Sequence, residues 1–161
     1  MNWTDVLRDK SLHDLPYKIE LNERGLIEMS PATILHGMLQ TAIADLLRDH
    51  IRGGRRITEC PIDTRKGTKV PDVVWASREF MTTFGTQTPF PQAPEILVEV
   101  LSPSNTKDEI LEKQNLYFER GAKEVWTCAA NGQMRFYTET SELKQSILVP
   151  QFPSLVTLED Q

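Results

Sequence analysis

Alternating apolar and polar positions near the start of the chain predict a β-hairpin. Two short runs of this kind, Tyr17–Leu21 and Leu26–Met29, are separated by four residues that end in Gly25. Glycine reaches the backbone angles of a tight turn without steric cost, so we expect the chain to reverse there.

A change to helical spacing marks the next element. Apolar residues recur every three or four positions from Ile34 to Leu47, which is the period of a helix with one buried face. Ser30-Pro31 has the form of an N-cap followed by a first-turn proline, and Gly53-Gly54 is typical of a helix end. We therefore predict one long helix between these two signals.

The middle of the chain has the residue types of β-strands. Arg55–Ile62 and Lys69–Ala76 are β-rich and bracket a turn-like segment, and Ser77 is a candidate cap for a short helix. Glu95–Leu101 is a dense apolar run interrupted only by Glu99. This pattern is typical of a central strand that is buried on both faces.

The C-terminal third adds another helix and further strands. Thr106 can cap a helix that Gly121 ends, and the strong hairpin signal Asn131-Gly132 separates two more strand-like runs. We expect a last strand at Ser146–Val149. The order of elements predicts an α/β (α+β) fold with a mixed β-sheet flanked by helices. The length of 161 residues predicts a single domain over residues 1–161.

Composition excludes several classes of protein. Hydrophobic residues make up 39% of the chain and charged residues 25%, which is ordinary for a folded domain. No apolar run approaches the roughly 20 residues of a membrane span, and the first residues lack an apolar secretion signal, so we expect a cytoplasmic protein. Cys60 and Cys128 have neither zinc-ligand spacing nor a disulfide framework, and we expect both to be small buried hydrophobes.

Charge is distributed unevenly along the chain. The net charge of −5 argues against a protein coated with nucleic acid, because sequence-independent binding depends on Lys and Arg that neutralise phosphates. Residues 48–69, however, include seven basic residues against three acidic ones. This segment is either a solvated loop or a basic strip that holds a nucleic-acid backbone. In the second interpretation, the candidate contacts are Arg55, Arg56, Arg65, Lys66 and Lys69.

Two acidic residues stand in apolar, strand-like surroundings. Asp72 is the acid of the run PDVVW, and Glu99 follows 27 residues later in the run LVEVL. A buried carboxylate must be protonated or satisfied by a cation or by hydrogen bonds. A structural ion pair is one explanation. A shared divalent metal is the other, since hard cations prefer oxygen ligands.

Three further side chains are candidates for the same site. Lys113 lies on the helix predicted after the Glu99 strand, where it could position or deprotonate a water, although many helix lysines only face solvent. Glu20 could complete an acidic cluster or face water, and His36 could be a hydrogen-bonding residue at the edge of the core. The motifs of hydrolase triads, nucleotide-binding loops and zinc proteases are absent.

Together these segments resemble the Uma-two family of restriction endonucleases, within the PD-(D/E)XK nuclease superfamily. The resemblance rests on Ile19–Leu21, Leu26–Pro31 with His36, Val70–Val73, Leu97–Ser104, and a closing block of Lys113, Tyr117, Gly121 and Glu124–Trp126. It implies a restriction-endonuclease-like core with an N-terminal β-hairpin, Asp72 and Glu99 as metal ligands, and Mg (or Mn) as the ion. Tyr117 joins the catalytic candidates as a member of the closing block.

One departure from the superfamily pattern leaves two functions open. Leu101 stands two residues after Glu99, where the motif lysine is expected, and Lys113 is the natural substitute. The first hypothesis is a Mg-dependent DNA endonuclease that acts as a homodimer, with Asp72 and Glu99 holding the ion and Lys113 orienting the attacking water. The second is a catalytically degenerate module of the same fold that acts in DNA or protein binding.

Overall fold

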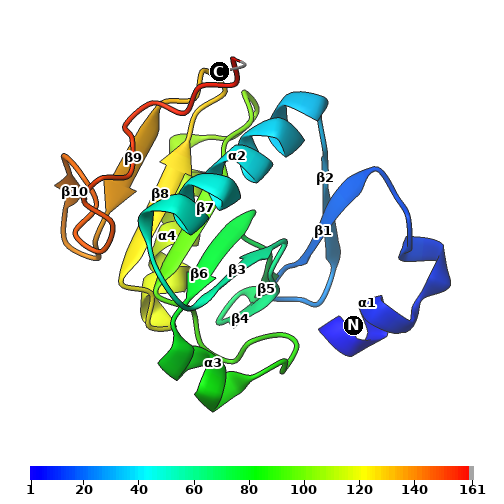
Figure 1. The fold of residues 1–161 in the computed structure, drawn as a ribbon. Coiled ribbons are helices and arrows are strands. Elements are labelled where there is room, and N and C mark those ends of the chain that lie inside the picture. The colour runs from blue at the N-terminus through cyan, green and yellow to red at the C-terminus, as the bar shows by residue number, and fades with distance from the viewer. Residues whose placement is uncertain (160–161) are drawn as a thin grey trace.

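A mixed β-sheet between two long helices forms the centre of the molecule, which the computed structural model describes over residues 1–159 (Figure 1). The elements are, in chain order, α1 (Trp3–Arg8), the 3-10 helix η1 (Lys10–Leu12), β1 (Tyr17–Leu21), β2 (Ile27–Pro31), α2 (Ile34–His50), β3 (Arg55–Thr58), β4 (Ile62–Thr64), β5 (Gly67–Lys69), β6 (Val73–Ala76), α3 (Arg78–Phe84), β7 (Ile96–Val100), α4 (Lys107–Glu119), β8 (Glu124–Cys128), β9 (Met134–Tyr137) and β10 (Glu142–Leu143).

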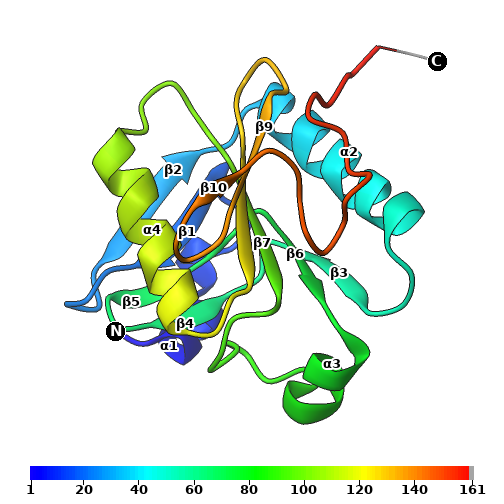
Figure 2. The same ribbon diagram turned by 90° about the vertical axis from the view of Figure 1, so that its left-hand side faces the viewer.

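The central sheet has the strand order β10-β9-β8-β7-β6-β3. Only β7 and β8 run parallel in it, and α4 lies between them in the chain. Helices α2 and α4 lie on opposite sides of the sheet (Figure 2). The pairs β1-β2 and β4-β5 form separate small sheets. This arrangement confirms the predicted mixed sheet flanked by helices and the N-terminal hairpin.

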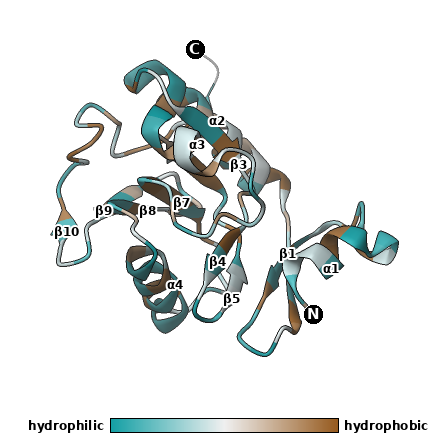
Figure 3. Cartoon of the chain, turned by 90° about the horizontal axis from the view of Figure 1, so that it is seen from below, coloured by the Kyte–Doolittle hydropathy of each residue, from teal (hydrophilic) through white to brown (hydrophobic). Residues whose placement is uncertain are grey.

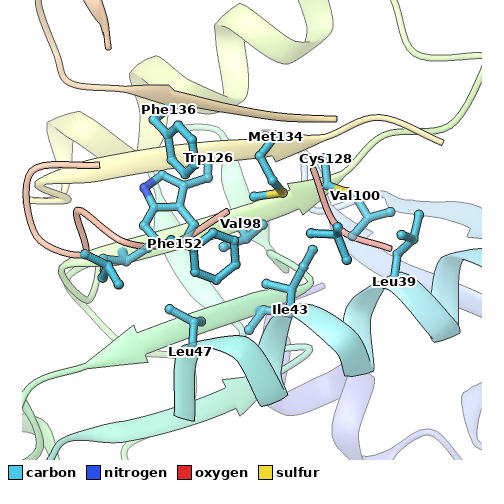
Figure 4. Close-up of a cluster of buried hydrophobic side chains, with 14 residues drawn as sticks. Leu39, Ile43, Leu47, Val98, Val100, Trp126, Cys128, Met134, Phe136 and Phe152 are labelled. Atoms are coloured by element: carbon cyan, nitrogen blue, oxygen red, sulfur yellow. The ribbon is translucent and has the colours of Figure 1, made fainter. Parts of the chain in front are cut away.

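The larger part of the core lies between α2 and the sheet. Leu39, Ile43 and Leu47 recur at intervals of four residues, so they share one face of α2, and each is at most 1% exposed. Ile43 and Leu47 point toward Phe152, and Leu39 lies beside Val100 (Figure 4). The ring centroids of Phe152 and Trp126 are 4.7 Å apart. The outer helix α4, in contrast, is largely hydrophilic (Figure 3).

A buried carboxylate fastens the C-terminal segment to this core. Glu124, which is 1% exposed, accepts hydrogen bonds from Trp126 Nε1 (2.7 Å), Ser146 Oγ (2.6 Å), Ile147 N (2.7 Å) and Leu148 N (3.0 Å). The strand predicted for this segment is therefore wrong. Two of its backbone N–H groups bond to a side chain instead of a neighbouring strand.

The predicted start of α2 is also wrong. Ser30 and Pro31 end strand β2, where Pro31 pairs with Tyr17, and Thr33 is the N-cap, because its hydroxyl accepts a hydrogen bond from His36 N (3.1 Å). A strand end tolerates proline, since the missing N–H costs little there.

Each of the two middle β-rich runs is divided between two strands. Residues 55–62 span β3 and the start of β4, and residues 69–76 span the end of β5 and all of β6. The first break falls at Glu59, whose φ of 51° turns the chain out of the central sheet. The antiparallel pairing of β8 with β9 confirms the hairpin predicted at Asn131-Gly132. Cys60 and Cys128 are both buried, as predicted.

The short helix α1 is not among the predicted elements, because six residues are too few for a clear helical period. Reciprocal hydrogen bonds between Asn2 and Asp5 form a capping box at its start. Its Trp3 and Val6 pack with Leu21 of the hairpin. Over residues 1–159, the structure contains no helix with both the length and the apolar character that crossing a bilayer requires.

Candidate active site

Asp72 and Glu99 lie side by side at one end of the central sheet. Asp72 immediately precedes β6, Glu99 belongs to β7, and these antiparallel strands pair Val73 with Val98. Asp72 N donates to Val98 O (3.0 Å), and Val100 N donates to Asp72 Oδ2 (2.7 Å). The structure thus brings together the two acids that the sequence predicts on neighbouring strands.

Lys18 of β1 lies between these two carboxylates. Its Nζ is 3.1 Å from Asp72 Oδ1 and 3.4 Å from Glu99 Oε2. The prediction of the site did not include this lysine. Side chains alternate along a strand, so Lys18 lies on the same face of β1 as Glu20. This alternation was the sequence feature that could have indicated Lys18 as a site residue.

Glu20 and Lys113 form a second ion pair beside the first. Lys113 Nζ is 2.7 Å from Glu20 Oε1 and 3.7 Å from Glu99 Oε1. The second oxygen of Glu20 accepts a hydrogen bond from Val70 N (2.6 Å). The buried Tyr117 hydroxyl donates to Glu99 Oε1 (2.6 Å). Three of the predicted site residues, Glu20, Lys113 and Tyr117, therefore lie in one network with Glu99.

His36 reaches the same network from the first turn of α2. Its Nε2 lies 3.0 Å from Asp72 Oδ1. This hydrogen bond raises the pKa of His36 above its usual value of 6.5, because the neighbouring carboxylate favours the imidazolium form. Because α2 starts at the Thr33 N-cap, His36 lies in its first turn, next to the acid pair.

The two central acids have opposite pKa shifts. Burial alone would raise the pKa of Asp72, but the hydrogen bond from His36 and the charge of Lys18 outweigh it and lower the pKa to about 2. Burial dominates at Glu99 and raises its pKa, although Lys113 and Lys18 oppose the shift. Asp72 is therefore the firmly ionised member of the pair.

Two hollows in the protein surface meet at this network. Their volumes are about 400 Å³ and about 390 Å³, and Glu99, Lys113, Ser30 and Asn105 line both of them. Leu101, in the position of the motif lysine, lines the first hollow. Glu99 and Lys113 are thus accessible to a ligand from two sides.

The predicted basic strip is divided by the fold. Lys66 and Lys69 line the first hollow, but Lys66 is paired with Glu112, and Lys69, 7% exposed, donates to Leu21 O (3.2 Å). Arg65 is paired with Glu119. The strip's other two candidates, Arg55 and Arg56, lie on the outer strand β3 and line neither of the two hollows.

The oxygen atoms at the centre of the network fit a divalent cation. Val100 N and the Tyr117 hydroxyl bind Asp72 Oδ2 and Glu99 Oε1, so Asp72 Oδ1 and Glu99 Oε2 are the oxygens that face Lys18. Among residues 1–159, no three His, Cys, Asp or Glu side chains converge as metal ligands. A pair of carboxylates nonetheless suits Mg²⁺, which keeps several waters and often binds through one or two carboxylates together with a phosphate.

Comparison with known proteins gives a family and solved structures of similar fold. Residues 9–160 match the family model Uma2, described as "Putative restriction endonuclease". Among solved structures, the chain is similar to "a putative nuclease belonging to DUF820 from Anabaena variabilis ATCC 29413", with a TM-score of 0.63 and 18% sequence identity over 77% of this chain and 73% of that chain. At this identity the likeness shows the fold alone. Comparison with curated proteins finds no match.

Proposed function

The chain belongs to the Uma2 family, as its motifs predict, and we propose that it is a divalent-metal-dependent DNA endonuclease. The observation that carries the proposal is that Glu99 and Lys113 line both hollows. Asp72, 1% exposed, lies directly behind them, and Lys18 contacts both acids. Two adjacent carboxylates and a lysine are a group that phosphodiester hydrolysis can use, because that reaction needs charge neutralisation at phosphate and an aligned nucleophile.

The proposed metal ligands are Asp72 and Glu99, with Mg²⁺ or Mn²⁺ as the ion. A bound ion would neutralise charge on the phosphate and favour a hydroxide nucleophile. The protein's own part is to fix both carboxylates: Val100 N holds one, and the Tyr117 hydroxyl holds the other.

Lys113 has the role of orienting the attacking water. Burial alone would lower its pKa, but Glu99 and Glu20 outweigh burial and raise the pKa. The side chain therefore stays an ammonium at neutral pH, which positions water and stabilises negative charge but does not remove a proton. Glu20, 2.7 Å away, holds the ammonium in place.

Plasmid nicking tests this function. Wild type, Asp72→Asn, Glu99→Gln and Lys113→Met are incubated with supercoiled DNA and Mg²⁺ or Mn²⁺. We expect metal-dependent nicking that falls by about 100-fold or more in the first two variants, since a metal supplies several kcal/mol. Asp45→Asn and Glu142→Gln are matched controls, because their carboxylates are about half exposed and lie outside the network. Equal nicking by wild type and Asp72→Asn would refute the assignment.

A binding module without catalysis is the second candidate function. Leu101, which lines the first hollow in the position of the motif lysine, favours this function, because a leucine can neither orient water nor neutralise the charge of a phosphate. In that case, the protein would not cleave the DNA in the presence of any metal but would still bind it, so labelled DNA would shift in a gel-shift experiment. Cleavage that depends on Asp72 excludes this alternative.

A further inference from the structure

The side chain of Lys18 uses the carboxylate oxygens that a metal would need. One oxygen of each central acid is already bound, Asp72 Oδ2 by Val100 N and Glu99 Oε1 by the Tyr117 hydroxyl. The remaining oxygens, Asp72 Oδ1 and Glu99 Oε2, both lie within 3.4 Å of the Lys18 ammonium. His36 Nε2 shares the first of them, at 3.0 Å, so Lys18 is the one contact common to both remaining oxygens among the described residues. A divalent ion on the same oxygens would meet this positive charge at contact distance.

Lys18 differs in this respect from the other cations of the site. His36 contacts Asp72 but no second acid, and Lys113 contacts Glu20 and Glu99. Lys18 is the cation that joins Asp72 to Glu99. Its charge is firmly held as well: burial would lower the pKa of Lys18, but the surrounding carboxylates raise it above the usual value.

We infer that Lys18 is a resident cation that holds the two carboxylates together in the metal-free protein and that a divalent metal must displace. This inference rests on the proposed metal-dependent nuclease. Lys18 lines the second hollow, which gives its flexible side chain room to swing away from the acids. Lys18 is accordingly a positioning residue that sets the affinity for the metal, because the energy of breaking its two ion pairs is subtracted from metal binding.

Calorimetric titration with Mn²⁺ in the absence of DNA tests whether the metal displaces Lys18. We expect Lys18→Met to bind Mn²⁺ about tenfold or more tightly than wild type, since two close ion pairs no longer compete. Lys113→Met should gain less, because Lys18 stays between the acids. Lys123→Met, which removes an exposed lysine at the opposite end of the sheet from Glu99, should bind as wild type does. An unchanged or weaker affinity in Lys18→Met would overturn the inference.

Labelling of the unchanged protein gives a second test, which does not depend on the folding of a variant. The Lys18 side chain is 13% exposed, so an amine-acylating reagent should modify it slowly. Displacement by Mn²⁺ should raise the rate of modification at Lys18, measured by mass spectrometry, and leave Lys69 unchanged. A rate at Lys18 that does not respond to saturating Mn²⁺ overturns the inference.

The displacement of Lys18 by metal and the nuclease activity can be refuted separately. Metal-dependent nicking together with unaltered Mn²⁺ affinity in Lys18→Met would overturn the displacement and leave the nuclease in place. Tighter Mn²⁺ binding by Lys18→Met without nicking in any protein would support the displacement and refute the nuclease.

Discussion

The hydrogen bond from Tyr117 to Glu99 makes a measurable contribution to stability. Tyr117 is fully buried, and its hydroxyl lies 2.6 Å from Glu99 Oε1. Phenylalanine keeps the ring and removes only the donor. Hydrogen bonds to charged groups contribute about 1.5 to 3 kcal/mol, and the next donor to this oxygen, Lys113 Nζ, is 3.7 Å away. We expect Tyr117→Phe to lose about 2 kcal/mol of unfolding free energy, or about 4 to 8 °C in Tm for a chain of this size.

Urea denaturation and calorimetry measure this loss at alkaline pH, above the raised pKa of Glu99. The matched control is Tyr137→Phe, because the Tyr137 hydroxyl has no hydrogen bond to the described residues; its change should stay under about 0.5 kcal/mol. The difference should also depend on pH. Tyr117 stabilises the anion of Glu99, whose pKa burial raises, so the loss is largest above that pKa and shrinks as the pH falls through it. A Tyr117→Phe protein as stable as the control variant would refute the reasoning.

Three further predictions concern other positions. His36→Asn should destabilise the protein most below pH 6.5. The pKa of His36 is raised in the folded protein, so its stabilising effect is complete below pH 6.5 and is lost as the pH rises through the folded pKa. Urea titrations at about pH 6 and about pH 9 check this direction, and a loss of stability that does not depend on pH would contradict it. Ile43→Ala should cost about 3 kcal/mol, since Ile43 is 0% exposed in the α2 layer; chemical denaturation measures this, and a loss under about 1 kcal/mol would contradict the packing. Glu59→Gly should gain about 0.5 to 1 kcal/mol because φ is 51° at an exposed position; a lower Tm in calorimetry would contradict it.

Local patterns were sufficient to predict the sheet-and-helix order but not every boundary. The Ser30-Pro31 pair has the form of a helix start, yet pairing of Pro31 with Tyr17 extends the hairpin through it. That pairing joins residues 14 positions apart, so helix-cap preferences could not indicate it. The break at Glu59 has the same kind of cause, since Glu59 N bonds to Asp72 O in a distant part of the chain.

The site shows a similar division between local and distant information. Asp72 and Glu99 were predictable because an acid in an apolar strand needs a partner. Lys18 was not predicted, because a lysine on a strand beside a turn usually faces solvent. It is buried only where the hairpin packs over the strand ends, and its partners lie 54 and 81 positions later. The charge count of the basic strip likewise omitted Glu112 and Glu119 on α4, which pair with two of its cations.

The buried carboxylate of Glu124 imposes an order on biosynthesis. Synthesis places Glu124 in the chain at least 22 residues before the three donors of Ser146, Ile147 and Leu148. Until those residues leave the ribosome, β8 carries an anion with one donor, Trp126 Nε1, and the Trp126 ring lacks its contact with Phe152. The contacts that bury this carboxylate and this ring are therefore complete only once residue 152 has been added to the chain.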